Sequence, residues 1–281
     1  QASDASLDKL GGVAWQAKKA RIKNRIKEMA NELIKIAANR QTSKAEKLEV
    51  SKAIFDEFSA RFQFAETDDQ LDAISDVISD LASGKPTDRL ICGDVGFGKT
   101  EVALRGAFVA SMCGYQVAIV TPTTLLARQH GKLFQERFNG FPIQICVLSR
   151  MTSQKKGAQI KQAVADGTCQ VVIGTHALLS KKMLYNNLGL IIVDEEQHFG
   201  VSQKEQLKKI RSDIHVLTLS ATPIPRTLQL ALTGVREMSL IATPPVDRLA
   251  VRTFVGPWDS IILREAIMRE KLRGGQVFVV C

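Results

Sequence analysis

One eight-residue stretch combines the residue types that bind phosphate. It reads GDVGFGKT, runs from Gly93 to Thr100, and fills the pattern G-x-x-x-x-G-K-[ST]. Its glycines let the backbone curl, so that amide N–H groups and the positive end of a following helix meet a phosphate. Lys99 would neutralise the outer phosphates, and the Thr100 hydroxyl would ligate Mg²⁺. The residues expected to contact a nucleoside triphosphate here are Gly93, Val95, Gly96, Phe97, Gly98, Lys99, Thr100 and Glu101.

Two adjacent carboxylates, Asp194 and Glu195, follow the apolar run LIIV. Placing a charged carboxylate at the end of a buried strand costs free energy unless the carboxylate binds a cation. For Asp194 the expected cation is the Mg²⁺ of the phosphate site. Glu195 is then placed to polarise an attacking water. A second carboxylate favours hydrolysis over transfer to a phosphate acceptor, and the alternative is a solvated acidic loop.

Two weaker candidates accompany these motifs. Gln70 and Thr67 follow Phe64 and precede the phosphate-binding stretch. An amide can read the edge of adenine and an aromatic ring can stack on it, whereas the alternative is a helix N-cap beside core phenylalanines. Ser220 and Thr222, in the segment SAT, offer hydroxyls that either bond the acidic loop or cap a strand-to-helix turn.

The elements that must position these residues are short strands and helices in alternation. From Arg89 onward the apolar runs are LIC (90–92), VAIV (117–120), IQICVL (143–148), VVIG (171–174), LIIV (190–193), HVLTLSA (215–221) and LAVRTFV (249–255). Alternation of this kind predicts an α/β fold with a mostly parallel sheet covered by helices. Ligands bind at the carboxyl ends of such strands. Since the motifs follow the strands, we expect one composite site.

A basic segment precedes this region. Eight basic and two acidic side chains lie between Val13 and Arg40, in a chain whose formal net charge is +9. An apolar stripe from Ile22 to Ile36 predicts a long amphipathic helix, either docked on its own domain or acting as a connector. The basic excess is compatible with a polyanionic partner.

The remaining composition excludes several classes of protein. Five scattered cysteines predict neither a disulfide framework nor a metal site. The chain has no long apolar run and no signal peptide, so we expect no membrane partner and a cytoplasmic location. The helix predicted at 260–273 is followed by the strand-like QVFVVC, for which no neighbouring strand is evident, and we expect the chain to be a piece of a longer protein.

The full set of motifs resembles the first motor lobe of superfamily 2 helicases and translocases. The chain is most similar to bacterial transcription-repair coupling factors, and RecG-type fork-reversal helicases come second. The segments that carry this similarity are LDKLGGVAW, DRLICGDVGFGKTEVALR, VDEEQHFGV and TLSATPIPRTL. RecG-type proteins usually have serine in place of Phe97. The resemblance extends from Leu7 to the end of the chain. A departure is Gln197, where a histidine is common and where coupling to the SAT motif could differ.

The resemblance implies a RecA-like P-loop lobe that uses ATP and Mg²⁺, with Gln70 reading adenine and Lys99, Asp194, Glu195 and Thr222 in catalysis. It implies DNA-phosphate contacts from Thr123, Thr124, Ser149, Arg150, Thr175 and His176. The implied domains are a tail (1–12), a basic connector helix and linker (13–45), motor lobe 1 (46–254), and a linker with the truncated start of lobe 2 (255–281).

The family implies an ATP-dependent double-stranded DNA translocase that displaces stalled RNA polymerase and couples transcription to nucleotide excision repair. Regions outside this chain would bind the polymerase and the excision-repair protein. Two alternatives stay open. One is a RecG-like fork-reversing helicase, and the other is a nucleotide-gated DNA-binding module without motor action.

Overall fold

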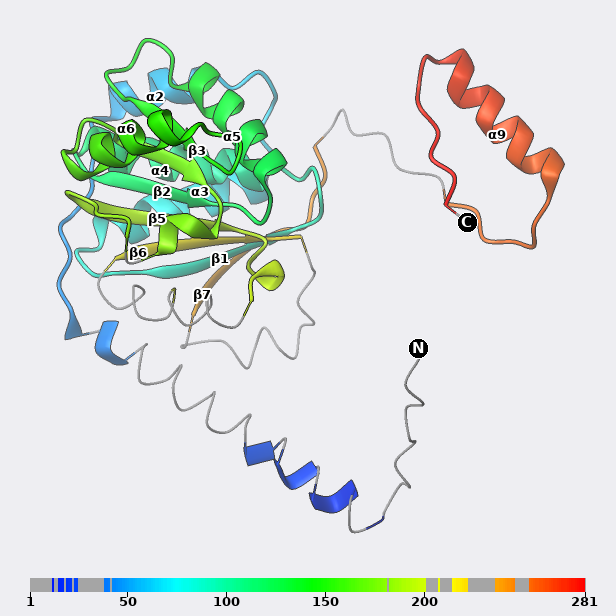
Figure 1. Ribbon diagram of the computed structural model, residues 1–281, viewed down its shortest axis with the longest axis horizontal. Coiled ribbons are helices and arrows are strands. Elements are labelled where there is room, and N and C mark those ends of the chain that lie inside the picture. Colours follow the sequence, from blue (N-terminus) through cyan, green and yellow to red (C-terminus); the bar gives the residue numbers. More distant parts are fainter. Residues whose placement is uncertain are drawn as a thin grey trace. The chain divides into compact units, whose positions relative to one another are not determined.

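The computed structural model describes residues 12, 15–17, 19–21, 23, 24, 38–40, 42–180, 182–200, 207, 214–221, 236–245 and 253–280. They belong to two compact units, residues 1–246 and residues 247–281. The first unit holds the sheet and the motifs, and the second holds one helix (Figure 1). The apolar stripe expected between Ile22 and Ile36 lies outside the described residues.

The first unit contains a parallel sheet whose described strands number seven, in the order β3-β4-β2-β5-β6-β1-β7. The strands are β1 (Asp88–Gly93), β2 (Gln116–Val120), β3 (Ile145–Leu148), β4 (Val171–Gly174), β5 (Leu188–Asp194), β6 (His215–Ser220) and β7 (Glu237–Ile241). The predicted α/β class with a parallel, helix-covered sheet is confirmed.

Helices cover both faces of the sheet (Figure 1). They are α2 (Lys52–Ala60), α3 (Asp68–Ala82), α4 (Lys99–Met112), α5 (Thr124–Arg137) and α6 (Gln154–Ala165), with short 3-10 turns η1 (His176–Leu179) and η2 (Glu196–His198). Successive strand residues point to opposite faces. Ile119 therefore packs in one hydrophobic cluster with α3, α4 and α5, and its neighbour Ala118 packs in the other with α6.

Most sequence predictions of elements are confirmed. Six of the expected apolar runs form strands. The helix N-cap given as one alternative for Thr67 and Gln70 is present, since α3 begins in a capping box between these two residues. The second unit contains the expected C-terminal helix as α9 (Ser260–Leu272). No helix among the described residues is both long enough and apolar enough to span a bilayer.

The sequence predictions differ from the structure at four places. The edge strand β7 and the helix α2 were not predicted. The run at 249–255 lies partly outside the described residues, and its described part, 253–255, is not a strand. Residues 276–280 are also not a strand, because no strand in the described part of the chain pairs with them and a single strand leaves its backbone groups without a ladder.

Candidate functional site

The phosphate-binding stretch connects the end of β1 to the start of α4. Gly96 and Gly98 have φ values of 81° and 84°, the left-handed region that glycine adopts without strain. At Gly93 an added Cβ would lie 3.0 Å from the carbonyl oxygen of Ile241, so a side chain there would press against the backbone of β7. The loop therefore curls between a strand and a helix N-terminus, the arrangement that presents amide groups to phosphate.

Lys99 lies at the centre of this loop. Its Nζ donates to the carbonyl oxygens of Gly93, at 2.6 Å, and Asp94, at 3.0 Å, and the residue is only 9% exposed. Burial lowers the pKa of Lys99, while the charges of Glu195 and Asp194 act in the opposite direction. A buried ammonium held by loop carbonyls can exchange them for phosphate oxygens. The donor set thus fits a nucleotide phosphate.

Gln70 supports the loop from the side of α3. Its Oε1 accepts a hydrogen bond from the backbone N–H of Thr67 at 3.1 Å, and its Nε2 donates to the carbonyl oxygen of Phe97 at 2.8 Å. The residue is 2% exposed, and a Cβ added at Gly98 would lie 2.3 Å from its Nε2. Both ends of the carboxamide are bonded to protein. Phe64 is 59% exposed, and its ring meets the ring of Phe62 edge to face with centroids 5.6 Å apart.

The acidic pair is placed beside this loop. Asp194 ends β5, and its Oδ2 lies 3.0 Å from Nε2 of His130 on α5. Glu195 has a φ of 52°, uncommon for a residue with a side chain. Its Oε1 accepts from the backbone N–H of Ala221 at 3.0 Å, and its Oε2 accepts from the Gln197 amide. The side chain of Glu195 therefore bonds directly to the segment SAT.

Not every predicted site residue lies with this group. Thr222 is outside the described residues, whereas Ser220 ends β6 and is buried. Glu101, predicted to contact the nucleotide, instead bonds Arg105 at 2.9 Å and Arg137 at 2.6 Å in the core. Its position on α4 directs the side chain away from the phosphate loop, and burial raises the pKa of Glu101. The side chain of Glu101 therefore belongs to a buried ion-pair cluster.

The residues expected to touch DNA follow three neighbouring strands. Thr123 and Thr124 follow β2, Ser149 and Arg150 follow β3, and Thr175 and His176 follow β4. Thr123 caps α5, because its hydroxyl accepts from the backbone N–H of Leu126 at 3.2 Å. All six residues line one or both of two cavities, of about 420 Å³ and about 330 Å³.

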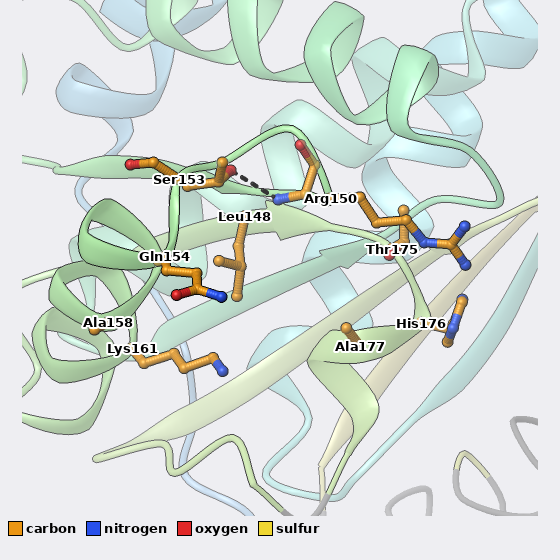
Figure 2. Close-up of a pocket in the computed structure, with 12 residues that line it drawn as sticks. Leu148, Arg150, Ser153, Gln154, Ala158, Lys161, Thr175, His176 and Ala177 are labelled. Carbon is orange, nitrogen blue, oxygen red and sulfur yellow. Dashed lines mark hydrogen bonds between the residues drawn. The ribbon is translucent and has the colours of Figure 1, made fainter.

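The two cavities share Arg150, Thr175 and His176. In Figure 2 these three side chains lie at one end of the larger cavity, and Lys161 and Gln154 of α6 lie at the other. Hydroxyl, amide and cationic groups of this kind suit phosphate oxygens and carry no base information. Lys161 and Gln154 were not predicted as site residues. The sequence did contain an indication of a polar helix beginning there, namely Ser153 as a possible N-cap and the lysines that follow it.

Strand order divides the sheet edge into two adjoining regions. The DNA-contact candidates follow β3, β4 and β2, and the nucleotide candidates follow β5, β6 and β1. The boundary between these regions falls between β2 and β5. His130 of α5 contacts Asp194, which ends β5, at this boundary. His130 was not predicted as a site residue. A signal existed, because it lies three residues after the buried Ala127 and four before the buried Phe134, on the helix face that packs on the sheet.

Comparisons with known proteins agree with this geometry. The chain is 53% identical over 281 residues to the transcription-repair-coupling factor of Rickettsia prowazekii (strain Madrid E), covering 99% of this chain and 25% of that protein. It is 48% identical to the Escherichia coli (strain K12) protein of the same name, covering 98% and 24%. The chain thus spans about a quarter of the curated relatives it matches.

A solved structure of RecG bound to a three-way DNA junction superposes with a TM-score of 0.76 at 32% identity, covering 95% of this chain and 36% of that one. The DEAD/DEAH box helicase family model matches residues 67–231, more than half of the chain, and this span begins at the N-cap of α3 and includes the phosphate loop and the acidic pair. The chain belongs to the DEAD/DEAH box helicase family.

Proposed function

We propose that this chain is the first motor lobe of an ATP-driven double-stranded DNA translocase. In the complete protein it displaces stalled RNA polymerase and couples transcription to nucleotide excision repair. The observation that carries the proposal is the placement of Asp194 and Glu195 close enough to the buried phosphate-loop lysine, Lys99, to act on its charge, on a chain about 50% identical to transcription-repair-coupling factors over nearly its whole length. The lobe corresponds to residues 46–254, and residues 13–45 are the connector before it.

In this proposal the phosphate loop binds the triphosphate of ATP, and Lys99 exchanges its loop carbonyls for phosphate oxygens. Mg²⁺, held near Thr100 and Asp194, would neutralise charge that develops on the phosphates. Glu195 accepts a proton from the attacking water and remains anchored through its bond to Ala221. Because this bond joins Glu195 to Ala221, a movement of Glu195 during hydrolysis would also move the segment after β6.

The second region of the sheet edge binds the DNA backbone. Its side chains are short hydroxyls with Arg150 and His176, so contacts go to phosphate and binding is independent of base sequence. Electrostatic binding of this type weakens as salt increases. RNA polymerase and the repair protein bind regions outside this chain.

The 281-residue chain alone hydrolyses ATP very slowly. The second lobe would supply arginines from across the cleft, and such an arginine contributes a rate factor of about 10³ to 10⁵ in P-loop enzymes. We also expect the lone lobe to bind nucleotide weakly, because the groups from across the cleft are missing.

A fork-reversing helicase is the second candidate. It is favoured by the 32% identity to RecG over 95% of the chain. A third candidate, of another class, is a nucleotide-gated DNA-binding module. Glu195→Gln separates it from a motor, since the amide keeps an oxygen for Ala221 but cannot accept the proton. A motor loses its ATPase activity and keeps ATP binding, whereas a pure switch is unaffected.

The test of the function is release of a stalled RNA polymerase from DNA by the complete protein. We expect release with ATP, no release without it, and none with Lys99→Ala. If the complete protein hydrolyses ATP in response to DNA but releases no polymerase, the fork-reversal candidate replaces the first.

A further inference from the structure

The carboxylate of Asp194 and the ring of His130 form a pair across two elements. Nε2 of His130 lies 3.0 Å from Oδ2 of Asp194, and the two side chains are 11% and 13% exposed. The residues are 64 positions apart in the sequence, so only the fold brings them together: α5 packs over β3 and β4, and its His130 contacts the residue that ends β5. A ring that carries its proton on Nε2 donates it to the carboxylate.

The packing of α5 fixes the position of that ring. Gly131 allows the helix to lie close to β3, because a Cβ there would be 2.5 Å from Cγ2 of Val147. One turn further on, Phe134 meets the ring of His130 edge to face, with centroids 6.4 Å apart. Phe134 is itself 1% exposed and stacks on Phe138. The imidazole is therefore set against Asp194 by a well-packed helix.

A fixed donor on one carboxylate oxygen has a chemical consequence. The bond to His130 uses Oδ2 of Asp194 and so fixes the orientation of the carboxylate. The position of the other oxygen, Oδ1, is fixed with it. Groups that hold a ligand carboxylate in this way commonly change metal affinity by about 10- to 100-fold when they are removed. A carboxylate held in one orientation would bind a cation at the phosphate loop more tightly than one that is free to rotate.

The same helix also reaches the proposed DNA face. α5 starts at Thr124, directly after its cap Thr123, and both line the smaller cavity. His130 lies less than two turns later on the same rigid element. The start of α5 therefore lies in the DNA-contact region, and His130 on the same helix contacts Asp194 in the nucleotide region.

We infer that His130 is a positioning residue that orients Asp194 toward the Mg²⁺ of the nucleotide site and couples that carboxylate, through α5, to DNA contact at Thr123 and Thr124. The inference rests on the proposed ATP-driven function. It assigns His130 no contact with substrate.

The test uses the complete translocase and three variants. His130→Ala removes the donor, and His130→Gln replaces it with an amide whose nitrogen can reach the same oxygen. Lys132→Ala is the matched control, on the same helix with a side chain 80% exposed. Binding of a fluorescent ADP analogue is titrated in EDTA and then with increasing Mg²⁺, and ATPase is measured with and without DNA.

The expected result is specific to the metal. His130→Ala raises the Mg²⁺ concentration for half-maximal nucleotide binding by about 10-fold or more, leaves affinity in EDTA unchanged, and lowers the DNA-stimulated rate more than the basal rate. His130→Gln restores most of the Mg²⁺ dependence, and Lys132→Ala matches the unmodified protein.

Two results would overturn the inference alone and leave the proposed ATP site standing. One is an unchanged Mg²⁺ dependence in His130→Ala. The other is an equal loss of affinity with and without Mg²⁺ that His130→Gln does not repair, because that pattern belongs to a residue that only fills space. Absence of nucleotide binding in the unmodified protein would overturn the proposed ATP site itself, and the inference with it.

Discussion

Nε2 of Gln70 donates a hydrogen bond to the carbonyl oxygen of Phe97 over 2.8 Å and so ties the first turn of α3 to the phosphate loop. The other end of the same carboxamide closes the capping box with Thr67. A single buried side chain therefore fixes both the start of a helix and the course of the loop.

This relationship predicts the effect of Gln70→Ala. Loss of a buried bond to the loop, worth about 1 to 2 kcal/mol, should lower nucleotide affinity by about tenfold. Because the bond supports the loop rather than a base, ATP and GTP should lose affinity equally. Fluorescent-nucleotide competition measures both, with Asp72→Ala on the exposed side of α3 as the control. A loss confined to ATP would instead assign Gln70 to reading adenine.

The buried position of Glu101 predicts a stability effect. Glu101→Leu leaves Arg105 and Arg137 without their shared partner in the core, and removing one member of a buried ion pair costs about 3 to 5 kcal/mol. Urea denaturation measures the free energy of unfolding. Glu136→Leu breaks the exposed pair with Lys132 and should change stability by less than about 1 kcal/mol. Equal effects of the two changes would contradict the placement of Glu101 in the core.

Arg150 lies in both cavities and is exposed, so it should contribute one phosphate contact. Arg150→Ala should weaken DNA binding to a similar extent on unrelated sequences and reduce the slope of log K against log salt by about 0.9. Fluorescence anisotropy at several salt concentrations measures the slope. An unchanged slope, or a loss that depends on sequence, would remove Arg150 from the phosphate-binding set.

His215 predicts how stability depends on pH. Burial lowers the pKa of its imidazole to about 4, and its Nδ1 lies 2.9 Å from the Thr87 hydroxyl. An unfolded chain has the ordinary value near 6.5. Between these values the unfolded state binds a proton that the folded state rejects. The free energy of unfolding should therefore fall as pH drops from about 6.5 to 4, by at most about 1.4 kcal/mol per pH unit.

The check is urea denaturation at pH 7 and pH 5, for the unmodified chain and for His215→Gln. The variant should be less stable at pH 7, because it disturbs the contact with Thr87, and should show a shallower pH dependence. The same slope in both proteins would mean that another group titrates.

The sequence predicted the parts of the fold that depend on local pattern. Runs such as VAIV and LIIV are central strands, buried on both faces, and their apolar character is continuous. The strand β7, with sequence EMSLI, escaped prediction because it is an edge strand whose exposed Glu237 and polar Ser239 interrupt the apolar run. The run QVFVVC has strand-like composition, but its described part has no strand partner.

The site was predictable where a motif carries its own geometry. The phosphate loop, the acidic pair and the strand-end hydroxyls were found because each sits within a few residues of a strand end. Two features of the site were not predictable: the contact of His130 with Asp194 and the burial of the Glu101 side chain in the core. Both depend on how α4 and α5 lie against the sheet. Local spacing places His130 on the sheet-facing side of its helix, but it does not identify Asp194 as the partner of His130.

If this lobe belongs to an ATP-driven DNA translocase, the complete protein should displace a triplex-forming strand from duplex DNA, and a strand-displacement assay is the measurement to make. We expect displacement that requires ATP, does not depend on the base sequence of the track, and is lost with Lys99→Ala. Failure to displace the strand while ATP is hydrolysed, or displacement that persists in Lys99→Ala, would contradict it.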